Sequence, residues 1–355
     1  MSMLNLPGLG KSTAYVGTTI SQAHFGANFL FDRDGGQDAG SISDPYAAFA
    51  EKTGLGNLRY PGGTLTETRL DLANPNALNQ DFMGKDTNSR EPTVGVSDFL
   101  DYAKKIGASA NFVLPTYRFL NTDPDQSGHR QVNAGQEAAL RSFVNFVLTD
   151  AFSKGVKIDA FELGNEWYVD NSDTFGFSMS PVEYGRVAAY LAVVVESEIK
   201  GFNAGLPAVQ KVNPDIVVQV GPGGNAEWYA ASGHERPEAY CGTLASATNL
   251  IFEQFKSMES RAAVDGILMH RYLEGGDCDI NGWSYSAFSR WTKLAAATPG
   301  FSKPNLYVTE WNVSSRNTAQ LGLNQVDSMV ELVEEMAIAG VGHANVWAVQ
   351  QNNKT

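Results

Sequence analysis

The chain has 355 residues, of which 43% are hydrophobic and 18% charged. This is a globular composition, and the length suits one large α/β domain. Acidic residues outnumber basic residues by 39 to 26, which gives a formal net charge of −13. Binding to a polyanion depends on clustered lysines and arginines, and the sequence contains no basic run. We therefore expect neither nucleic acid nor a membrane as a partner, whereas a neutral carbohydrate suits this charge.

The sequence shows neither a membrane span nor a conventional signal peptide. No apolar run approaches the ~20 residues of a spanning helix, and Met1–Gly10 lacks a basic segment followed by a long apolar one. We expect a soluble protein that is either cytoplasmic or exported without a conventional signal peptide. Cys241 and Cys278 form one disulfide or remain two free thiols, and no spacing indicates zinc. We expect no metal and no organic cofactor.

Apolar runs bounded by turn residues predict eight strands. Several of these runs are continuous rather than alternating, as expected when both faces of a parallel sheet are covered. The predicted strands are Tyr15–Gly26, Leu55–Tyr60, Ala110–Pro115, Ala160–Leu163, Ile216–Val220, Gly266–His270, Leu306–Thr309 and Asn345–Val349.

Helical signals occupy the segments between these strands. Asp44 and Pro45 have the pattern of a helix start, and Gly54 is expected to end that helix. Ser180 and Glu183 form a capping box that opens a helix running towards residue 200. Segments 71–91 and 121–136 are polar and are expected to be irregular loops. The other predicted helices are Asp98–Ile106, Ala138–Ser153, Leu244–Ala263, Ser286–Ala296 and Gln325–Ala339.

Eight strands that alternate with helices predict a (β/α)8 TIM barrel rather than an open doubly wound sheet. The eighth predicted strand leaves only residues 350–355 after it. We therefore expect the barrel to lack its last helix or a C-terminal accessory domain. Residues 1–355 are interpreted as a single catalytic domain and as a fragment of a longer chain.

Two glutamates follow apolar strands. Residues 161–163 lead into Glu166, and residues 306–308 lead into Glu310. A carboxylate at the end of a buried strand is costly unless it is hydrogen-bonded, paired or used in chemistry. The carboxyl ends of barrel strands meet at one rim, so these two carboxylates can face each other across a cleft. Cleavage of a glycosidic bond by double displacement requires such a pair. Glu162 is interpreted as a structural ion-pair partner rather than a second catalyst.

Five further residues at the strand ends have two alternative interpretations each. Trp167 and Trp311 are either packing residues or apolar platforms for a sugar ring. His270 is either a hydrogen-bonded core histidine or a substrate-binding residue. Asn225 and Trp228 follow the fifth predicted strand. Each either lines the substrate pocket or belongs to a loop that has no contact with the substrate.

The motifs at the strand ends resemble those of clan A of the glycoside hydrolases. Within this clan they are most similar to the α-L-arabinofuranosidase-type family, and the β-xylosidase and β-glucuronidase (heparanase-like) families share parts of the pattern. Residues 64–67, Thr-Leu-Thr-Glu, depart from the arabinofuranosidase pattern. This departure leaves the identity of the sugar open but does not affect the reaction that the resemblance implies. The motifs are Leu58-Arg59-Tyr60-Pro61-Gly62-Gly63, Leu163-Gly164-Asn165-Glu166, His270-Arg271-Tyr272 and Glu310-Trp311-Asn312.

The resemblance implies a retaining O-glycosyl hydrolase that degrades poly- or oligosaccharides, with Glu166 as acid/base and Glu310 as nucleophile. It also implies that Arg59 and Tyr272 donate to Glu310 and that Asn165 binds the 2-hydroxyl of the sugar. The acid must keep its proton while the nucleophile stays ionised, so we expect different surroundings for the two glutamates. Two alternatives are a transglycosidase with the same glutamates and a non-catalytic carbohydrate-binding barrel.

Overall fold

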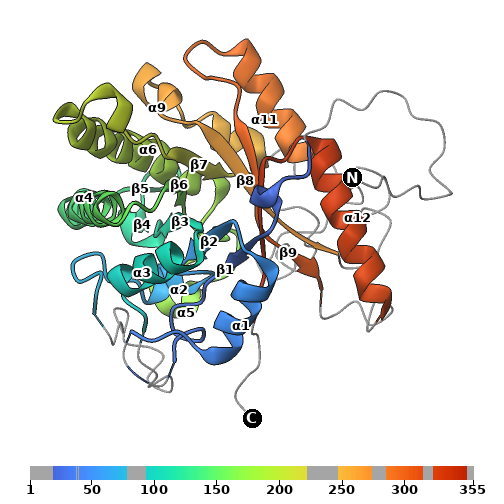
Figure 1. Ribbon diagram of the computed structural model, residues 1–355. Coiled ribbons are helices and arrows are strands. Elements are labelled where there is room, and N and C mark those ends of the chain that lie inside the picture. The colour runs from blue at the N-terminus through green and yellow to red at the C-terminus, as the bar shows by residue number, and fades with distance from the viewer. Residues whose placement is uncertain are drawn as a thin grey trace.

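The computed structural model describes residues 19–36, 38, 40–77, 93–221, 247–273, 285–314 and 323–349. Eight strands form one closed barrel in the order β1-β10-β9-β8-β7-β6-β3-β2, and all neighbouring strands are parallel (Figure 1). The predicted (β/α)8 TIM barrel is therefore confirmed. The strands are β1 (Gly26–Asn28), β2 (Asn57–Tyr60), β3 (Ser109–Leu114), β6 (Ile158–Leu163), β7 (Asp215–Gln219), β8 (Gly266–Leu273), β9 (Asn305–Val313) and β10 (His343–Val346).

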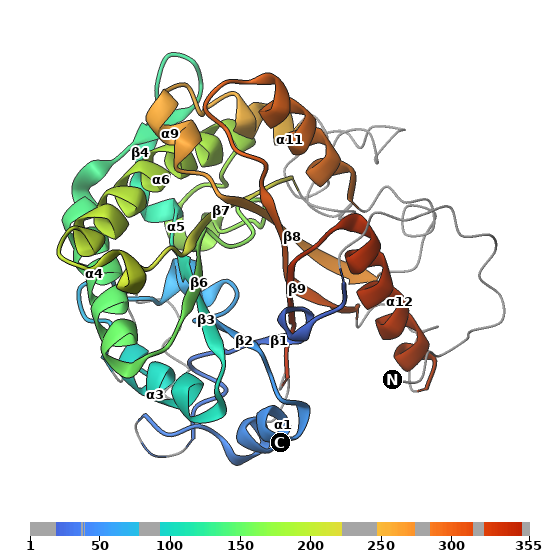
Figure 2. The ribbon, with the colours of Figure 1, turned by 45° about the horizontal axis from the view of Figure 1, so that its top comes forward.

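The longer helices lie around the outside of the strands, as Figures 1 and 2 show from two directions. They are α1 (Asp44–Thr53), α3 (Val96–Ile106), α4 (Glu137–Lys154), α6 (Pro181–Ala204), α11 (Ser286–Ala297) and α12 (Leu323–Ala339). Shorter helical segments are α2 (Leu65–Thr68), α5 (Ser172–Phe175), α9 (Met258–Ala262), η1 (Gln22–His24), η2 (Tyr117–Phe119), η3 (Ala134–Gln136) and η4 (Ala208–Gln210).

The sequence predicted that the barrel lacks its last helix and that no segment spans a membrane. Within the described ranges, no helix follows β10. That the chain is a single catalytic domain cut from a longer protein stays a prediction. None of the helices in the described part of the chain is long and apolar enough to cross a bilayer.

Local sequence sets the ends of several helices as predicted. In the capping box of α6, Ser180 Oγ accepts a hydrogen bond from the backbone N–H of Glu183 (3.3 Å), and Glu183 Oε2 accepts one from the backbone N–H of Ser180 (2.8 Å). Helices α1, α3 and α4 end at Gly54, Gly107 and Gly155, each in the left-handed conformation. Glycine adopts this conformation without the steric penalty of a Cβ atom.

The first strand was predicted in the wrong place. The predicted range was Tyr15–Gly26, whereas β1 is Gly26–Asn28 and is preceded by the turn η1; residues 15–18 lie outside the described part. The predicted range is rich in β-branched residues, which are typical of strands, but a strand forms only where the chain can hydrogen-bond to neighbouring strands. Only from Gly26 onwards does the chain pair with β10 and β2.

Two other segments differ from their predictions. The single helix predicted over Leu244–Ala263 is divided, within the described residues, into helical residues 247–252 and the short helix α9, which begins at a Ser257 cap. The segment 121–136, predicted to be irregular, contains the antiparallel hairpin β4 (Leu120–Pro124) and β5 (Arg130–Val132). The hairpin is mostly exposed and polar, so the hydrophobic pattern gives no signal for it.

The molecule has apolar contacts both outside and inside the barrel. The larger cluster fills the layer between the strands and the helices. The smaller cluster consists of Ala160, Val217, Leu268 and Tyr307 inside the barrel. Other buried interior side chains are polar or charged, which the fold tolerates only when they are paired.

Candidate active site

A bulge in β9 points Glu310 into the barrel. In a regular strand, Tyr307 and Thr309 share one face and Glu310 lies on the other. Tyr307 belongs to the apolar cluster inside the barrel, so regular alternation would direct Glu310 outwards. The pairings of β9 with both β8 and β10 shift by one residue after Val308, which returns Glu310 to the interior. A β-bulge thus positions this carboxylate.

A tight turn after β6 positions Glu166. Gly164 has a φ of 86°, and a Cβ atom at this position would lie 2.9 Å from two side-chain atoms of Thr116. Only glycine fits there. Glu166 itself has a φ of 43°, in the left-handed region that residues with side chains rarely adopt. The side chain of Glu166 is 23% exposed, against 3% for Glu310, so it is the more accessible of the two carboxyl groups.

Arg59 connects four side chains at the centre of the site. Its side chain is fully buried, and Nη1 donates to Glu310 Oε1 (2.7 Å) and to Asn28 Oδ1 (2.9 Å). Nε donates to Glu162 Oε2 (2.7 Å), and Nη2 donates to Asn165 Oδ1 (2.9 Å). Arg59 therefore makes the expected contact with Glu310, and through Asn165 it also contacts the residue that precedes Glu166.

Tyr272 and His270, both on β8, contact the two glutamates. The hydroxyl of Tyr272 donates to Glu310 Oε2 (2.8 Å), which is the other contact predicted for Glu310. His270 Nδ1 lies 3.0 Å from Glu166 Oε1 and 3.5 Å from Glu310 Oε2. The hydroxyl of Tyr168 donates to Glu166 Oε1 (3.2 Å). His270 thus lies between the two carboxyl groups.

The two glutamates and His270 are close enough to share one reacting group. One ligand atom from each of Glu166, His270 and Glu310 lies within 4.8 Å of the others. The same three atoms are the set that could surround a metal ion. However, the guanidinium of Arg59 already contacts Glu310, and a second cation beside it would be repelled. The expectation that the protein needs no metal stays a prediction.

The surroundings of the three groups shift their pKa values in different ways. Burial raises the pKa of Glu166, and the hydrogen bond from Tyr168 and the charge of Arg59 oppose this. Burial also raises the pKa of Glu310. Burial lowers the pKa of His270 to about 4, so its imidazole is neutral at neutral pH. The positive charge that favours an ionised Glu310 is therefore the guanidinium of Arg59 and not an imidazolium, and the hydrogen bond from Tyr272 acts in the same direction.

The two tryptophans that follow Glu166 and Glu310 are packed inside the protein. Trp167 has no exposed surface and stacks on Tyr184, with ring centroids 5.5 Å apart and planes 16° apart. Trp311 is 4% exposed. For both residues the structure favours the packing alternative over the sugar platform, because no ring face is open.

Sequence reasoning missed three residues at the site. Asn28 was missed because the first strand was misplaced, and Tyr168 because a tyrosine two residues after a glutamate has no distinguishing pattern. Trp347 follows β10; it is partly exposed, and its ring fills the space above Gly63, where a Cβ atom would lie 2.5 Å from it. Its place directly after a strand is only a weak signal in the sequence, because a tryptophan beside an apolar run is ordinary.

Four residues discussed in the sequence analysis lie outside the described residues. They are Asn225, Trp228, Cys241 and Cys278. The pocket role of Asn225 and the state of the two cysteines stay predictions.

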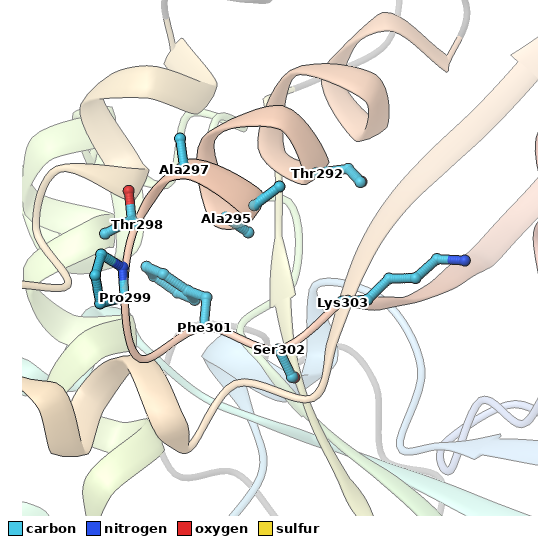
Figure 3. A pocket seen from close by; sticks show the side chains of 9 residues that line it. Thr292, Ala295, Ala297, Thr298, Pro299, Phe301, Ser302 and Lys303 are labelled. Carbon is cyan, nitrogen blue, oxygen red and sulfur yellow. The ribbon is translucent and has the colours of Figure 1, made fainter.

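A surface hollow of about 480 Å³ lies at the other end of the barrel (Figure 3). It is formed by the end of α11 and by residues 298–303, which lead into the first residues of β9. Figure 3 shows Phe301 beside Pro299, whereas Lys303 extends away from them. Lys303 is the only titratable residue in the lining, so this hollow has no acid/base pair and is not a second candidate for the catalytic site.

Searches with the sequence found no matching protein-family model and no matching curated protein. Solved structures do match. A family 51 alpha-L-arabinofuranosidase from Bifidobacterium longum aligns with a TM-score of 0.59 at 13% identity, covering 95% of this chain and 69% of that one. A Paenibacillus polymyxa xyloglucanase from glycoside hydrolase family 44 aligns with a TM-score of 0.51 at 15% identity, covering 94% and 73%.

A third similar structure is a hyperthermostable endo-1,4-beta-D-mannanase from Thermotoga petrophila, with a TM-score of 0.50 at 14% identity and coverage of 92% and 88%. The identities are so low that these alignments establish the barrel fold and not the activity. This fold is one that several glycoside hydrolases use.

Proposed function

We propose that this protein is a retaining glycoside hydrolase that cleaves O-glycosidic bonds of poly- or oligosaccharides by double displacement. The observation that carries this proposal is the facing pair Glu166 and Glu310, with a carboxyl oxygen of each within 4.8 Å. Inverting enzymes keep their two carboxyl groups about 6.5 to 9.5 Å apart to admit a water molecule, whereas retaining enzymes place them about 5 to 5.5 Å apart. The short separation supports the retaining mechanism.

Glu310 is the proposed nucleophile. It accepts hydrogen bonds from Arg59 and Tyr272, one on each oxygen. Donors on both oxygens stabilise the ionised form, and they hold the carboxylate below the anomeric carbon that it attacks. Arg59 contacts Glu310 directly and Glu166 only at longer range, so Glu310 is the first of the two to lose its proton.

Glu166 is the proposed acid/base. Burial raises its pKa, and among the described residues no cation contacts it as Arg59 contacts Glu310. Tyr168 donates to Oε1 and His270 Nδ1 contacts the same oxygen. We infer that Oε1 is the acceptor and that Oε2 carries the proton given to the leaving group. The same oxygen then takes a proton from water in the second step.

Asn165 has a donor left for the substrate. Its Oδ1 accepts from Arg59, while Nδ2 is buried without a hydrogen-bond partner among the described residues. A buried amide N–H without a partner is unfavourable, and the 2-hydroxyl of a bound sugar would satisfy it. This contact strengthens when charge develops on the sugar in the transition state.

The sugar proposed first is an α-L-arabinofuranoside, on the strength of the strand-end motifs. A β-xyloside and a β-glucuronide are the next candidates on the same grounds. The three similar structures are an arabinofuranosidase, a xyloglucanase and a mannanase, so the fold does not select one sugar.

The test is a panel of aryl glycosides that includes α-L-arabinofuranoside, β-D-xyloside, β-D-glucuronide and β-D-glucoside. We expect the protein to cleave at least one of them, and Glu310→Gln to lose turnover by about four orders of magnitude or more. The matched control is Glu198→Gln, a partly buried carboxylate of α6 that pairs with Arg141 of α4 (2.7 Å) outside the barrel. The control should stay within about tenfold of the parent. No cleavage of any glycoside, or equal activity in Glu310→Gln, would contradict the proposal.

A further inference from the structure

We propose that Glu162 is a positioning residue for the nucleophile: it holds Arg59 at Nε while Glu310 contacts Nη1, and it limits how strongly Arg59 pairs with Glu310. This inference deepens the proposed function and rests on it. The interpretation from the sequence, that Glu162 is only a structural ion-pair partner, does not include this effect on Glu310.

The geometry shows one cation shared between two carboxylates. Arg59 Nε lies 2.7 Å from Glu162 Oε2, and Arg59 Nη1 lies 2.7 Å from Glu310 Oε1. The side chains are 0% exposed for Arg59 and Glu162 and 3% exposed for Glu310. Water therefore screens neither contact appreciably, and a change in one ion pair is felt by the other.

Glu162 is fixed independently of the substrate. Asn111 Nδ2 donates to Glu162 Oε1 (3.2 Å), and Asn111 Oδ1 accepts from Asn57 Nδ2 (3.1 Å). Glu162, Asn111 and Arg59 belong to the barrel strands β6, β3 and β2. Side chains on rigid strands that are hydrogen-bonded on several sides hold their positions well.

The shared cation affects both steps of a double displacement. A guanidinium that pairs with two carboxylates lowers the basicity of Glu310 less than a guanidinium that pairs with Glu310 alone. A more basic carboxylate is the better nucleophile when the glycosyl-enzyme forms and the poorer leaving group when it breaks down. Glu162 would therefore favour formation of the glycosyl-enzyme at the expense of its breakdown.

Other titratable groups around the pair keep their protonation state near neutral pH. Burial keeps His270 neutral, and it raises the pKa of the nearby tyrosines far enough that they stay protonated. The groups that change charge are thus the carboxyl groups. The titratable neighbours are Glu166 after β6, His270 and Tyr272 of β8, Tyr307 and Glu310 of β9, and Tyr184 of α6.

The test is Glu162→Gln, which keeps the shape of the side chain and removes its charge. Arg59 then pairs more strongly with Glu310, so the acidic limb of the kcat/KM profile should move to lower pH by about one unit. The basic limb, which reports Glu166, should move in the same direction because the charge of Arg59 is less compensated. At the optimum, kcat/KM should fall about threefold, because the rate of nucleophilic attack follows only part of the change in basicity.

A second readout separates this role from a purely structural one. For an activated dinitrophenyl glycoside, breakdown of the glycosyl-enzyme limits kcat, and Glu310 is the leaving group in that step. In Glu162→Gln, kcat for this substrate should stay the same or rise while kcat/KM falls. The matched control is Glu183→Gln. It removes the charge of a buried carboxylate of α6 that lies away from Glu310 and pairs with Arg130 of β5 (3.2 Å). It should leave both limbs in place.

The inference is overturned if folded Glu162→Gln loses only thermal stability and keeps the pH profile and the kcat to kcat/KM ratio of the parent. If Glu162→Gln does not fold, Asn111→Ala is the variant that tests the inference. Without the Asn111 donor, Glu162 draws Arg59 more strongly, so the acidic limb should move to higher pH; an unmoved limb overturns the inference. A parent protein that cleaves no glycoside, or an active Glu310→Gln, is instead a failure of the proposed function.

Discussion

Glu166 and Glu310 have different surroundings, and a small number of neighbouring side chains account for the difference. Glu310 contacts the guanidinium of Arg59, whereas Glu166 contacts the neutral His270 and the hydroxyl of Tyr168. Burial raises the pKa of both, so the contacts decide which of them ionises first. In the proposed mechanism, one buried cation is enough to give the two glutamates different roles.

Replacing Tyr168 by Phe tests the environment of Glu166. The hydroxyl of Tyr168 stabilises the ionised form of Glu166 and lowers its pKa. Without this hydrogen bond the pKa rises, so Glu166 keeps its proton to higher pH. We expect the basic limb of the kcat/KM profile to move upwards by about half a unit, while the acidic limb stays in place. The direction is opposite to that expected for Glu162→Gln.

Tyr190→Phe is the control for this substitution, because its hydroxyl bonds to Glu137 on the outside of the barrel. It should leave both limbs of the profile in place. A basic limb that stays in place or moves to lower pH in Tyr168→Phe would show that this hydroxyl does not act on Glu166.

At the scale of single residues, the sequence predicted the charged centre better than its surroundings. Glu166, Glu310 and Arg59 stand out because a charge at the end of an apolar strand needs a partner. Tyr168 and Trp347 carry no such signal, since a tyrosine or tryptophan beside an apolar run is ordinary. Whether a ring faces a cleft or the core depends on packing across the barrel, which explains the outcome for Trp167.

At the scale of elements, local signals predicted helices well and strands less well. The capping box at Ser180 and Gly54 after α1 act within a few residues, and both are found as predicted. Strand pairing acts between distant segments, so the first strand was misplaced and the hairpin β4–β5 was missed. The bulge at Thr309 also depends on the register of two neighbouring strands, although it decides where Glu310 points.

Ser180→Ala tests how far a local cap stabilises its element. The variant loses the side-chain acceptor for the backbone N–H of Glu183, which should lower the free energy of unfolding by about 1 kcal/mol. The measurement is urea unfolding followed by circular dichroism. Because α6 lies outside the barrel, kcat/KM should not change. Ser153→Ala, an exposed serine in α4, should shift the free energy by less than about 0.5 kcal/mol, and an equal loss in both variants would argue against the cap.

At the scale of the whole molecule, the alternation of strands and helices was sufficient to predict the barrel. A closed parallel barrel brings the ends of β2, β6, β8 and β9 to one rim, which places Arg59, Glu166, His270 and Glu310 together although they are far apart in sequence. The choice of sugar depends on contacts beyond these strand ends, and neither the strand pattern nor the fold determines it.

The most direct test of the account is the configuration of the glycosyl azide that rescues Glu166→Ala. With a dinitrophenyl glycoside, this variant should still form the glycosyl-enzyme on Glu310, because the leaving group needs no proton. Azide then attacks from the side vacated by Glu166 and should give an azide of retained configuration, identified by NMR. Glu310→Ala should yield the inverted azide. An inverted azide from Glu166→Ala would assign Glu166 as the nucleophile and contradict the account.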